Sequence, residues 1–342
     1  MRFALDLDFE EWRTLCREEW GEAPFRADQI CGWIYARRVF AFEGMTNLSL
    51  DLRRKAAETF GEIVPREVKR EISRKDGTEK SLWSLHDGQS VESVLLLQDG
   101  RRTACISTQV GCPLGCTFCA TGQSGFVRNL SCGEIVGQFL AMEKQQETSI
   151  DNLVFMGMGE PFLNMGAFLK AVENLKHPKM RNLGARRMTV STAGIVPGIL
   201  ALAEANPGIR LAVSIHAAED ELRDRLMPVN RRYPLSELFA AIRTYQEKTG
   251  DRVSIEYMLM EGVNDSRSQA MILADRLKGL KSYVNLISWN ATCDSFRKPS
   301  RERVEQFRQV LVSRGIEAEV RRERGEDIAA ACGQLRKREG RI

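Results

Sequence analysis

The sequence predicts an α/β fold in which a parallel sheet forms an open (β/α)6 partial barrel, preceded by a small helical domain and a β extension. The first observation is that strand-like apolar runs alternate with helical periodicity between residues 101 and 322. The second is a cysteine-rich loop after the first of these strands, where parallel α/β folds place their chemistry. The chain is thereby divided into residues 1–65, 66–100, 101–322 and 323–342.

The first of these segments is expected to be a small helical domain. Apolar residues recur there at helical spacing in residues 10–16, 27–35 and 48–60. Three tryptophans of this region are expected to pack in its core rather than to stack on bases, namely Trp12, Trp20 and Trp33.

The second segment is expected to be a β extension, because the apolar period changes to two. Strands at 70–74 and 81–85 flank Asp76-Gly77, which is a hairpin turn signal. A third strand at 90–97 leads into the first core strand at 103–107.

The third segment carries the alternating elements of the core. Its further strands are expected at residues 151–156, 187–191, 210–216, 253–259, 283–287 and 317–321. Its helices are expected at residues 134–145, 167–175, 197–205, 235–248, 269–280 and 301–314. The last segment, 323–342, is expected to be a C-terminal loop that carries Cys332.

Composition restricts the class of protein. The 342 residues are 28% charged and 43% hydrophobic, which is ordinary for a soluble chain. No apolar run approaches the roughly 20 residues that cross a bilayer, and the N-terminus shows no signal-peptide pattern. We therefore expect a cytoplasmic protein without a membrane partner. Nine cysteines in such a chain suggest metal, redox or nucleophilic work rather than structural disulfides.

The formal net charge of +4 says little about nucleic acid, but basic residues are clustered. The clusters could line a phosphate track, although each one taken alone is better explained as solvated surface. They comprise Arg181, Arg186 and Arg187; Arg223, Arg225, Arg231 and Arg232; and Arg336, Lys337, Arg338 and Arg341.

The most informative stretch is the loop that carries Cys112, Cys116 and Cys119 at a C-x3-C-x2-C spacing. Three thiolates can hold three irons of a [4Fe–4S] cluster, which leaves the fourth iron open to a small molecule. This spacing resembles the radical S-adenosylmethionine (SAM) signature. A zinc knuckle and three unrelated buried cysteines are the alternatives, but zinc normally takes four ligands in two short pairs.

Polar residues follow the later core strands where each strand ends. Because these ends meet at one edge of a parallel sheet, we expect the residues to surround one cavity suited to a ribose and an adenine. Taken singly, each is more often a loop residue with satisfied hydrogen bonds, and His216 could be a packed core histidine. The residues are Gly159, Glu160, Ser191, Ser214, Ile215, His216 and Asn290.

Two further cysteines are candidates for a working thiol. Cys105 lies on the strand before the cluster loop, and Cys332 lies in a glycine-flanked loop near the C-terminus. A buried and inert thiol is the default for either one. The glycines and the acidic pair before Cys332 favour a shaped loop and a reactive thiol.

Taken in order, these motifs resemble the RlmN/Cfr family of radical SAM adenine methyltransferases, and the resemblance covers nearly the whole chain. The run Gly-Glu-Asp-Ile-Ala-Ala-Ala-Cys-Gly-Gln-Leu at the C-terminus resembles the RlmN branch. The resemblance implies methylation of C2 of one adenine in 23S rRNA and of the adenine 3′ to the anticodon in tRNA. It also implies a [4Fe–4S] cluster, two SAM molecules per turnover, an electron donor such as flavodoxin, an RNA-docking N-terminal domain and a monomer.

The resemblance also implies a role for each matching residue. Cys332 takes a methyl group from one SAM, and a radical made from a second SAM removes hydrogen from that group. The resulting carbon adds to adenine, Glu92 accepts a proton, and Cys105 attacks Cys332 to form a transient disulfide and free the base. Seven residues match SAM contacts: Gly159, Glu160, Ser191, Ser214, Ile215, His216 and Asn290. For Glu92, a charge at the surface of a strand edge is the alternative.

One segment departs from the family pattern. After Asn290 many members continue Pro-Phe-Pro, whereas this chain has Ala291-Thr292-Cys293-Asp294, so the shape of that wall is open and Cys293 is unexplained. Two other functions remain open. One is a Cfr-type methyltransferase acting on C8 and conferring antibiotic resistance, and the other is a non-catalytic RNA-binding protein with a structural zinc.

Overall fold

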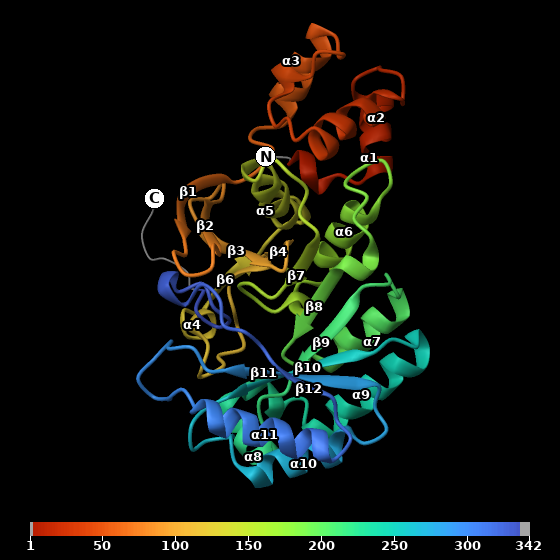
Figure 1. Ribbon diagram of the computed structural model, residues 1–342. Helices are drawn as coiled ribbons and strands as arrows, with labels where there is room; N and C mark the ends of the chain where they lie inside the picture. Colours follow the sequence, from red (N-terminus) through yellow and green to blue (C-terminus); the bar gives the residue numbers. More distant parts are fainter. Residues whose placement is uncertain (1–2, 336–342) are drawn as a thin grey trace.

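The computed structural model describes residues 3–335, which form one ten-stranded sheet with helices packed against it (Figure 1). The strand order is β1-β2-β3-β4-β7-β8-β9-β10-β11-β12. The strands of this sheet are β1 (Arg66–Ile72), β2 (Glu79–Ser84), β3 (Ser90–Gln98), β4 (Arg101–Cys105), β7 (Asn152–Phe155), β8 (Met188–Thr192), β9 (Arg210–Ser214), β10 (Val253–Leu259), β11 (Ser282–Ser288) and β12 (Ala318–Val320).

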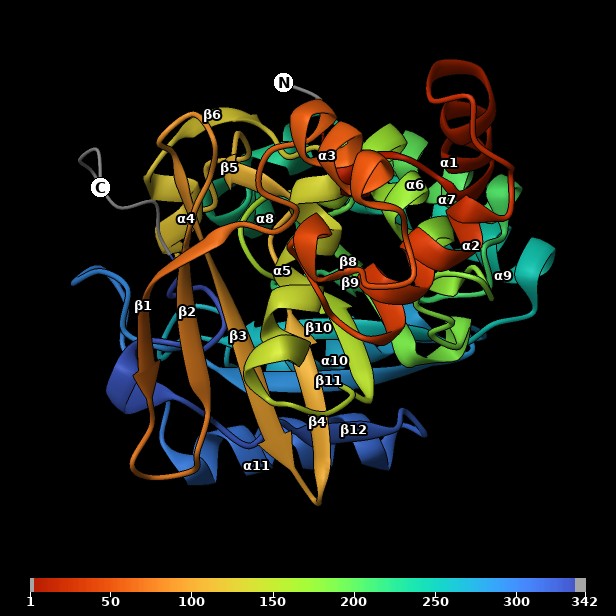
Figure 2. The ribbon, with the colours of Figure 1, turned by 90° about the horizontal axis from the view of Figure 1, so that it is seen from above.

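The predicted fold class is confirmed by the pairing of these strands. Every pair from β4 through β7, β8, β9, β10 and β11 to β12 is parallel, whereas β1 to β4 pair antiparallel. The β extension, β1 to β3, is therefore continuous with the core sheet, and Figure 2 shows these strands beside β4. The core helices are α5 (Cys132–Gln145), α6 (Met165–Lys176), α7 (Val196–Ala205), α8 (Asp220–Leu226), α9 (Leu235–Thr249), α10 (Arg267–Leu277) and α11 (Arg301–Ser313).

The N-terminal region is helical, as expected, and it packs on α5. Its helices are α1 (Phe9–Thr14), α2 (Arg26–Cys31) and α3 (Leu50–Thr59), with short π- and 3-10 turns between them. Asp8 and Glu11 form a capping box that fixes the start of α1. Trp12 and Trp20 are buried in this region and Trp33 is half-buried, which agrees with the expected core role.

Buried charges fasten the N-terminal helices to the core. Glu143, fully buried on α5, accepts hydrogen bonds from Arg38 at 3.2 Å and from Arg181 at 2.6 and 2.8 Å. Asp6 accepts from the Gly133 N–H at 2.6 Å. Because the Arg181 side chain is largely buried in this ion pair, its reading as solvated surface is wrong.

Several short elements near the cysteine loop escaped prediction. They are the hairpin of β5 (Gln109–Gly111) and β6 (Phe126–Asn129), the single turn α4 (Ala120–Gln123), and α8. These elements combine a length of three to seven residues with few apolar positions, so they lack the apolar run that indicated the core strands of similar length.

Within residues 3–335 no helix combines the length and the apolar character that a membrane span requires. The basic cluster at residues 336–341 lies outside the described part of the chain.

Candidate active site

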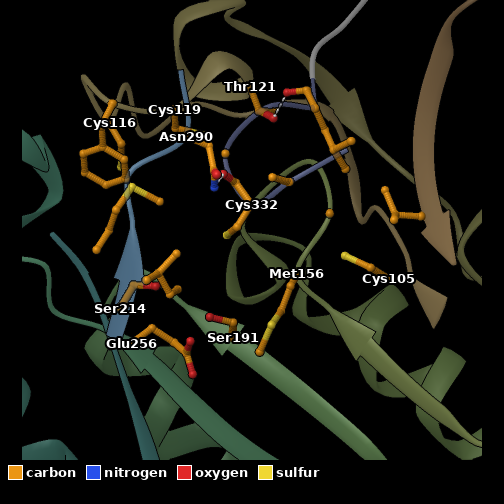
Figure 3. Close-up of a pocket in the computed structure, with 18 of the residues that line it drawn as sticks. Cys105, Cys116, Cys119, Thr121, Met156, Ser191, Ser214, Glu256, Asn290 and Cys332 are labelled. Atoms are coloured by element: carbon orange, nitrogen blue, oxygen red, sulfur yellow. Dashed lines mark hydrogen bonds between the residues drawn. The ribbon is translucent and has the colours of Figure 1, made fainter. Parts of the chain in front are cut away.

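A cavity opens at the carboxyl ends of the core strands and gathers most of the predicted residues (Figure 3). Cys332 projects into its centre, with Cys116 and Cys119 to one side and Cys105 to the other. From the predicted set, the lining includes Cys105, Cys112, Cys116, Cys119, Gly159, Glu160, Ser191, Ser214, His216, Asn290 and Cys332. Two predicted residues, Glu92 and Ile215, are not part of this lining.

Main-chain hydrogen bonds set the shape of the cysteine loop. Gly111 has a φ of +76°, and a Cβ at this position would lie 1.9 Å from the Gly125 carbonyl oxygen, so only glycine fits. The Cys112 N–H donates to that same oxygen at 3.0 Å. Further along, the Cys119 N–H donates to the Cys116 carbonyl at 3.2 Å. The loop thus presents three cysteines to one cavity without any regular element of its own.

Burial disfavours the ionised form of two of the thiols in this loop. Burial raises the pKa of Cys112 to about 12 and raises that of Cys116 well above its usual value. Such thiols keep their protons unless a metal replaces them. Among residues 3–335 no three His, Cys, Asp or Glu side chains are grouped as ligands of a single metal ion. A cubane takes one thiolate per iron, so the three cysteines of this loop match the number of ligands that such a cluster with one open iron requires.

Glu160 presents a buried carboxylate to the cavity. It follows Gly159, where a Cβ would lie 2.5 Å from the Gln109 side chain. The carboxylate accepts from the Phe162 N–H at 3.1 Å and from the Ala193 N–H at 2.7 Å. Burial nevertheless raises the pKa of Glu160 to about 7, because these hydrogen bonds offset only part of the desolvation. A buried carboxylate of this kind suits the amino group of a ligand.

His216 is a neutral imidazole with an unusual backbone. Its φ is +55°, and its Nδ1 accepts from the Met258 N–H at 3.0 Å. Burial first, and then the nearby Arg223, lower the pKa of His216 to about 3. The proton of the neutral ring must therefore lie on Nε2, which can donate but not accept.

Arg223 is a structural residue of the site that sequence reasoning misplaced. It is fully buried and donates to the carbonyls of Ile215 at 3.1 Å, Ser214 at 3.0 Å and Ala193 at 2.7 Å. Its guanidinium thereby joins the ends of β8 and β9. The suggestion that Arg223 belongs to a surface cluster of basic residues is wrong. Ile215 has no exposed surface, and its carbonyl serves this arginine.

Asn290 has an unused acceptor. Its Nδ2 donates to the Cys332 carbonyl at 3.3 Å, whereas its Oδ1 is buried without a hydrogen-bond partner in the described part of the chain. A buried amide oxygen normally has a partner, so a ligand amino group fits this position. Sequence reasoning missed Glu256 on the same cavity wall, whose carboxylate accepts from Ser254 and Asn285. Glu256 lies inside a strand of buried type, so the sequence did not indicate that it is a site residue.

The segment with Cys332 lies against the cysteine loop. The Gly333 carbonyl accepts from the Ala120 N–H at 2.8 Å, and the Leu335 carbonyl accepts from Thr121 Oγ1 at 2.5 Å. Burial raises the pKa of Cys332, and it raises the pKa of Cys105 to about 12. Both are free thiols here.

Glu92 lies beneath this segment rather than on the surface. It is 2% exposed, so its reading as a charge at a strand-edge surface is wrong. Its neighbours on β3 two and four residues along, Val94 and Leu96, line the cavity. Since side chains alternate along a strand, Glu92 belongs to the same face of the sheet.

Comparison with known proteins identifies the chain. A model described as the ribosomal RNA large subunit methyltransferase N-terminal domain matches residues 4–61, and the radical SAM superfamily model matches residues 106–273. A probable dual-specificity RNA methyltransferase RlmN from Petrotoga mobilis is 50% identical and aligned over 98% of this chain and 96% of its own length. The chain belongs to the RlmN family.

Further comparisons agree with this assignment. A probable dual-specificity RNA methyltransferase RlmN from Thermotoga maritima is also 50% identical, with 98% of each chain aligned. A crystal structure of a radical SAM methyltransferase from Sphaerobacter thermophilus superposes with a TM-score of 0.95 at 44% identity, covering 98% of this chain and 99% of the other. As a member of the RlmN family the chain is a radical SAM methyltransferase, and a [4Fe–4S] cluster and SAM follow from that class.

Proposed function

We propose that this RlmN family member methylates C2 of an adenine in 23S rRNA and of the adenine 3′ to the anticodon in tRNA, through a methylated cysteine and a transient disulfide. The observation that carries the proposal is the position of Cys332. Its side chain lies in the centre of a cavity that also holds the three cysteines of the loop and Cys105 (Figure 3). Two additional free cysteines beside such a loop are best explained by covalent thiol chemistry.

The cavity offers suitable groups for both cofactors. Cys112, Cys116 and Cys119 would hold the cluster. The Glu160 carboxylate and the unpartnered Asn290 Oδ1 fit the amino groups of SAM. Ser191, Ser214 and His216 complete the set, and Gly159 and Ile215 contribute through the backbone of the strand ends. Bound there, the cluster and SAM supply a one-electron cleavage that yields a hydrogen-abstracting radical.

The chain's own residues would carry the methyl group. The Cys332 thiolate displaces it from a first SAM, and after hydrogen abstraction, which uses a second SAM, the carbon on sulfur bonds to the adenine ring. Glu92 accepts the proton lost from the ring carbon, and the unpaired electron left on the ring would return to the cluster. Cys105 then attacks the Cys332 sulfur, so a disulfide forms, the sulfur–carbon bond breaks, and its electron pair stays with the carbon, which becomes the methyl group on protonation.

Partners and organisation follow from the same proposal. The N-terminal helices, residues 1–65, dock RNA beside the barrel of residues 101–322. The β extension, residues 66–100, joins these two parts. The C-terminal segment, residues 323–342, brings Cys332 to the cavity. An electron donor such as flavodoxin reduces the cluster. The protein works as a cytoplasmic monomer.

Mapping the modified base tests the proposed product. RNA from cells with and without the protein should differ by methyl groups at C2 of the two adenines when digested and analysed by mass spectrometry. Methylation at C8 instead would overturn the regiochemistry, and no difference in RNA would overturn the function.

Two single variants test the covalent route. Cys332→Ala should neither become methylated nor methylate RNA. Cys105→Ala should stop at the thioether between Cys332 and adenine, so it should copurify with RNA that survives denaturation, unlike salt-sensitive phosphate contacts. Denaturing electrophoresis before and after nuclease distinguishes them. A nuclease-sensitive shifted band for Cys332→Ala, or none for iron-loaded Cys105→Ala expressed with its RNA, would contradict these roles.

A further inference from the structure

The segment that carries Cys332 is held from two sides. On the cavity side it is bonded to the cysteine loop and to Asn290, as described above. On the opposite side it lies against the β1–β2 hairpin. There the Gly325 N–H donates to Asp76 at 3.0 Å, and Asp327 accepts from Ser73 Oγ at 2.7 Å. Figure 1 shows this C-terminal stretch, in blue, returning to the edge of the molecule near the β extension.

Between these anchors a single buried ammonium contacts the segment. Lys80 on β2 is 6% exposed, and its Nζ donates to the carbonyls of Ile328 at 2.5 Å and Ala329 at 3.3 Å. The same Nζ lies 3.3 Å from a Glu71 carboxylate oxygen and 3.9 Å from a Glu92 carboxylate oxygen. One side chain therefore touches both the Cys332 segment and the carboxylate to which we assign proton transfer.

The register of the β extension explains this convergence. Glu71 on β1 pairs directly with Lys80, and Leu82 on β2 pairs with Glu92 on β3. Lys80 and Glu92 are therefore diagonal neighbours on one face of the sheet, where long side chains reach one another. Lys80 is thus placed by strand pairing rather than by the segment that it contacts.

The contacts of Lys80 compensate the burial of its charge. A buried ammonium is costly unless carboxylates and hydrogen-bond acceptors surround it, and Lys80 has both. The segment in turn needs support from outside, because Ala329 has a φ of +49°, a left-handed conformation that is strained for a residue with a Cβ. Removing the ammonium would leave this bend and the two carbonyls without that support.

We propose that Lys80 is a positioning residue that couples the Cys332 segment to Glu92. By fixing the carbonyls at 328 and 329, it sets where the Cys332 sulfur lies over the cysteine loop, and by facing Glu92 it holds that carboxylate against the same segment. The inference rests on the proposed function, because it gives Lys80 its purpose through Cys332 and Glu92. Cluster binding and SAM binding do not depend on Lys80.

The test compares three variants of the cluster-loaded full chain. Lys80→Met keeps most of the stem and removes the ammonium, and Lys80→Arg restores a cation with several donors. Lys75→Met is the matched control, because Lys75 is 66% exposed and also faces this segment, 3.8 Å from Glu326. Each variant is measured for iron content, SAM affinity, hydrogen exchange of residues 325–335 and the rate of Cys332 methylation.

For Lys80→Met we expect wild-type iron content and SAM affinity. We expect exchange in residues 325–335 to rise about tenfold or more, because charge-assisted hydrogen bonds are lost. Methylation of Cys332 should slow by about tenfold or more, since its sulfur is no longer held in place. Lys80→Arg should recover part of both effects, and Lys75→Met should match the wild type.

The outcomes separate the inference from the proposed function. If Lys80→Met folds and binds iron but keeps wild-type exchange in residues 325–335, the positioning role is wrong whatever the activity. If exchange rises while Cys332 methylation is unchanged, the coupling to catalysis is wrong. If the wild type itself shows no methylated Cys332 with SAM, the covalent route of the proposed function fails, while the exchange comparison still reports on Lys80. A Lys80→Met protein that loses iron would show a general structural role instead and would also overturn the proposal.

Discussion

The two sides of the active-site cavity are built differently. On the barrel side, Glu160, Ser214 and His216 follow parallel strands, and main-chain or buried side-chain donors such as Arg223 fix them locally. On the loop side, Cys332 belongs to a segment whose described part, residues 323–335, has one regular element, the short turn η8 (Glu326–Ile328). Donors and acceptors from the β1–β2 turn, β2, α4 and Asn290 hold that segment.

This difference suggests a division of labour. The barrel side is part of the sheet, so it can present SAM and cluster ligands in one fixed geometry. The loop side depends on a limited number of long-range polar contacts, which are easier to exchange than a strand. In the proposed route Cys332 meets a methyl donor, a base and then Cys105 in turn, and a segment whose contacts can be exchanged suits that sequence of steps. Variants of the barrel side should therefore affect binding, and variants of the loop side should affect the covalent steps.

The largest effect is expected at the glycine that begins the cysteine loop. In Gly111→Ala the new Cβ would overlap the Gly125 carbonyl at 1.9 Å, so the loop cannot close and iron should be lost almost completely. Gly115→Ala is the matched control, because Gly115 also has a positive φ but nothing lies within 4 Å of its Cβ position. That control should cost about 1–2 kcal/mol of folding free energy and keep its iron. Iron analysis and the visible spectrum measure both, and equal iron in the two variants would show that loop closure does not depend on Gly111.

A smaller but still large effect is expected from Arg223→Met. This change leaves the carbonyls of Ala193, Ser214 and Ile215 without their buried donor, and one unsatisfied buried acceptor typically costs about 1–3 kcal/mol. We expect the free energy of unfolding to fall by roughly 2–5 kcal/mol and SAM affinity to fall with it. Arg225→Met on the same helix is exposed and should change neither quantity. Denaturant unfolding measures the first quantity and calorimetry with SAM the second. Wild-type SAM affinity in Arg223→Met would show that this arginine does not set the geometry of the SAM-binding residues.

Glu160→Gln should weaken SAM binding about tenfold while keeping the cluster, because one charge-assisted hydrogen bond is lost. The effect should depend on pH. Burial raises the pKa of Glu160 to about 7, so the wild-type carboxylate becomes protonated as the pH falls through about 7 and loses its advantage over glutamine. The ratio of wild-type to variant affinity should therefore shrink between about pH 8 and about pH 6, with the titration of SAM itself cancelling in the ratio. A ratio that does not change with pH would show that the Glu160 carboxylate does not contact SAM in the bound state.

Sequence patterns were sufficient where function follows local structure. Alternation predicted the strands and the parallel sheet, and spacing identified the cysteine loop and the polar strand ends. The same reasoning failed for Arg223, which looks like one of several surface arginines but satisfies carbonyls of two strands. It also passed over Lys80 and Glu256, because their partners lie far away in sequence and only the packed sheet brings them together. The domain boundaries and the roles of the site residues stay predictions.

The smallest effect is expected at the outer anchor of the loop side. Asp327 accepts from Ser73 Oγ at 2.7 Å and from the Arg74 N–H at 3.1 Å, and the Ser73 hydrogen bond chiefly lowers the pKa of Asp327. Asp327→Asn removes the charge and one acceptor at a solvent-accessible position, where water can replace much of what is lost.

Hydrogen exchange in residues 325–330 should therefore rise measurably in Asp327→Asn, but by less than in Lys80→Met, and iron content and SAM affinity should remain those of the wild type. Because the pKa of Asp327 is lowered by folding, protonation at acidic pH should loosen the same residues in the wild type and leave the variant less affected. If Asp327→Asn instead reduced SAM affinity as Arg223→Met is expected to do, the two sides of the cavity would be coupled, and the division of labour between a fixed barrel side and an adjustable loop side would not hold.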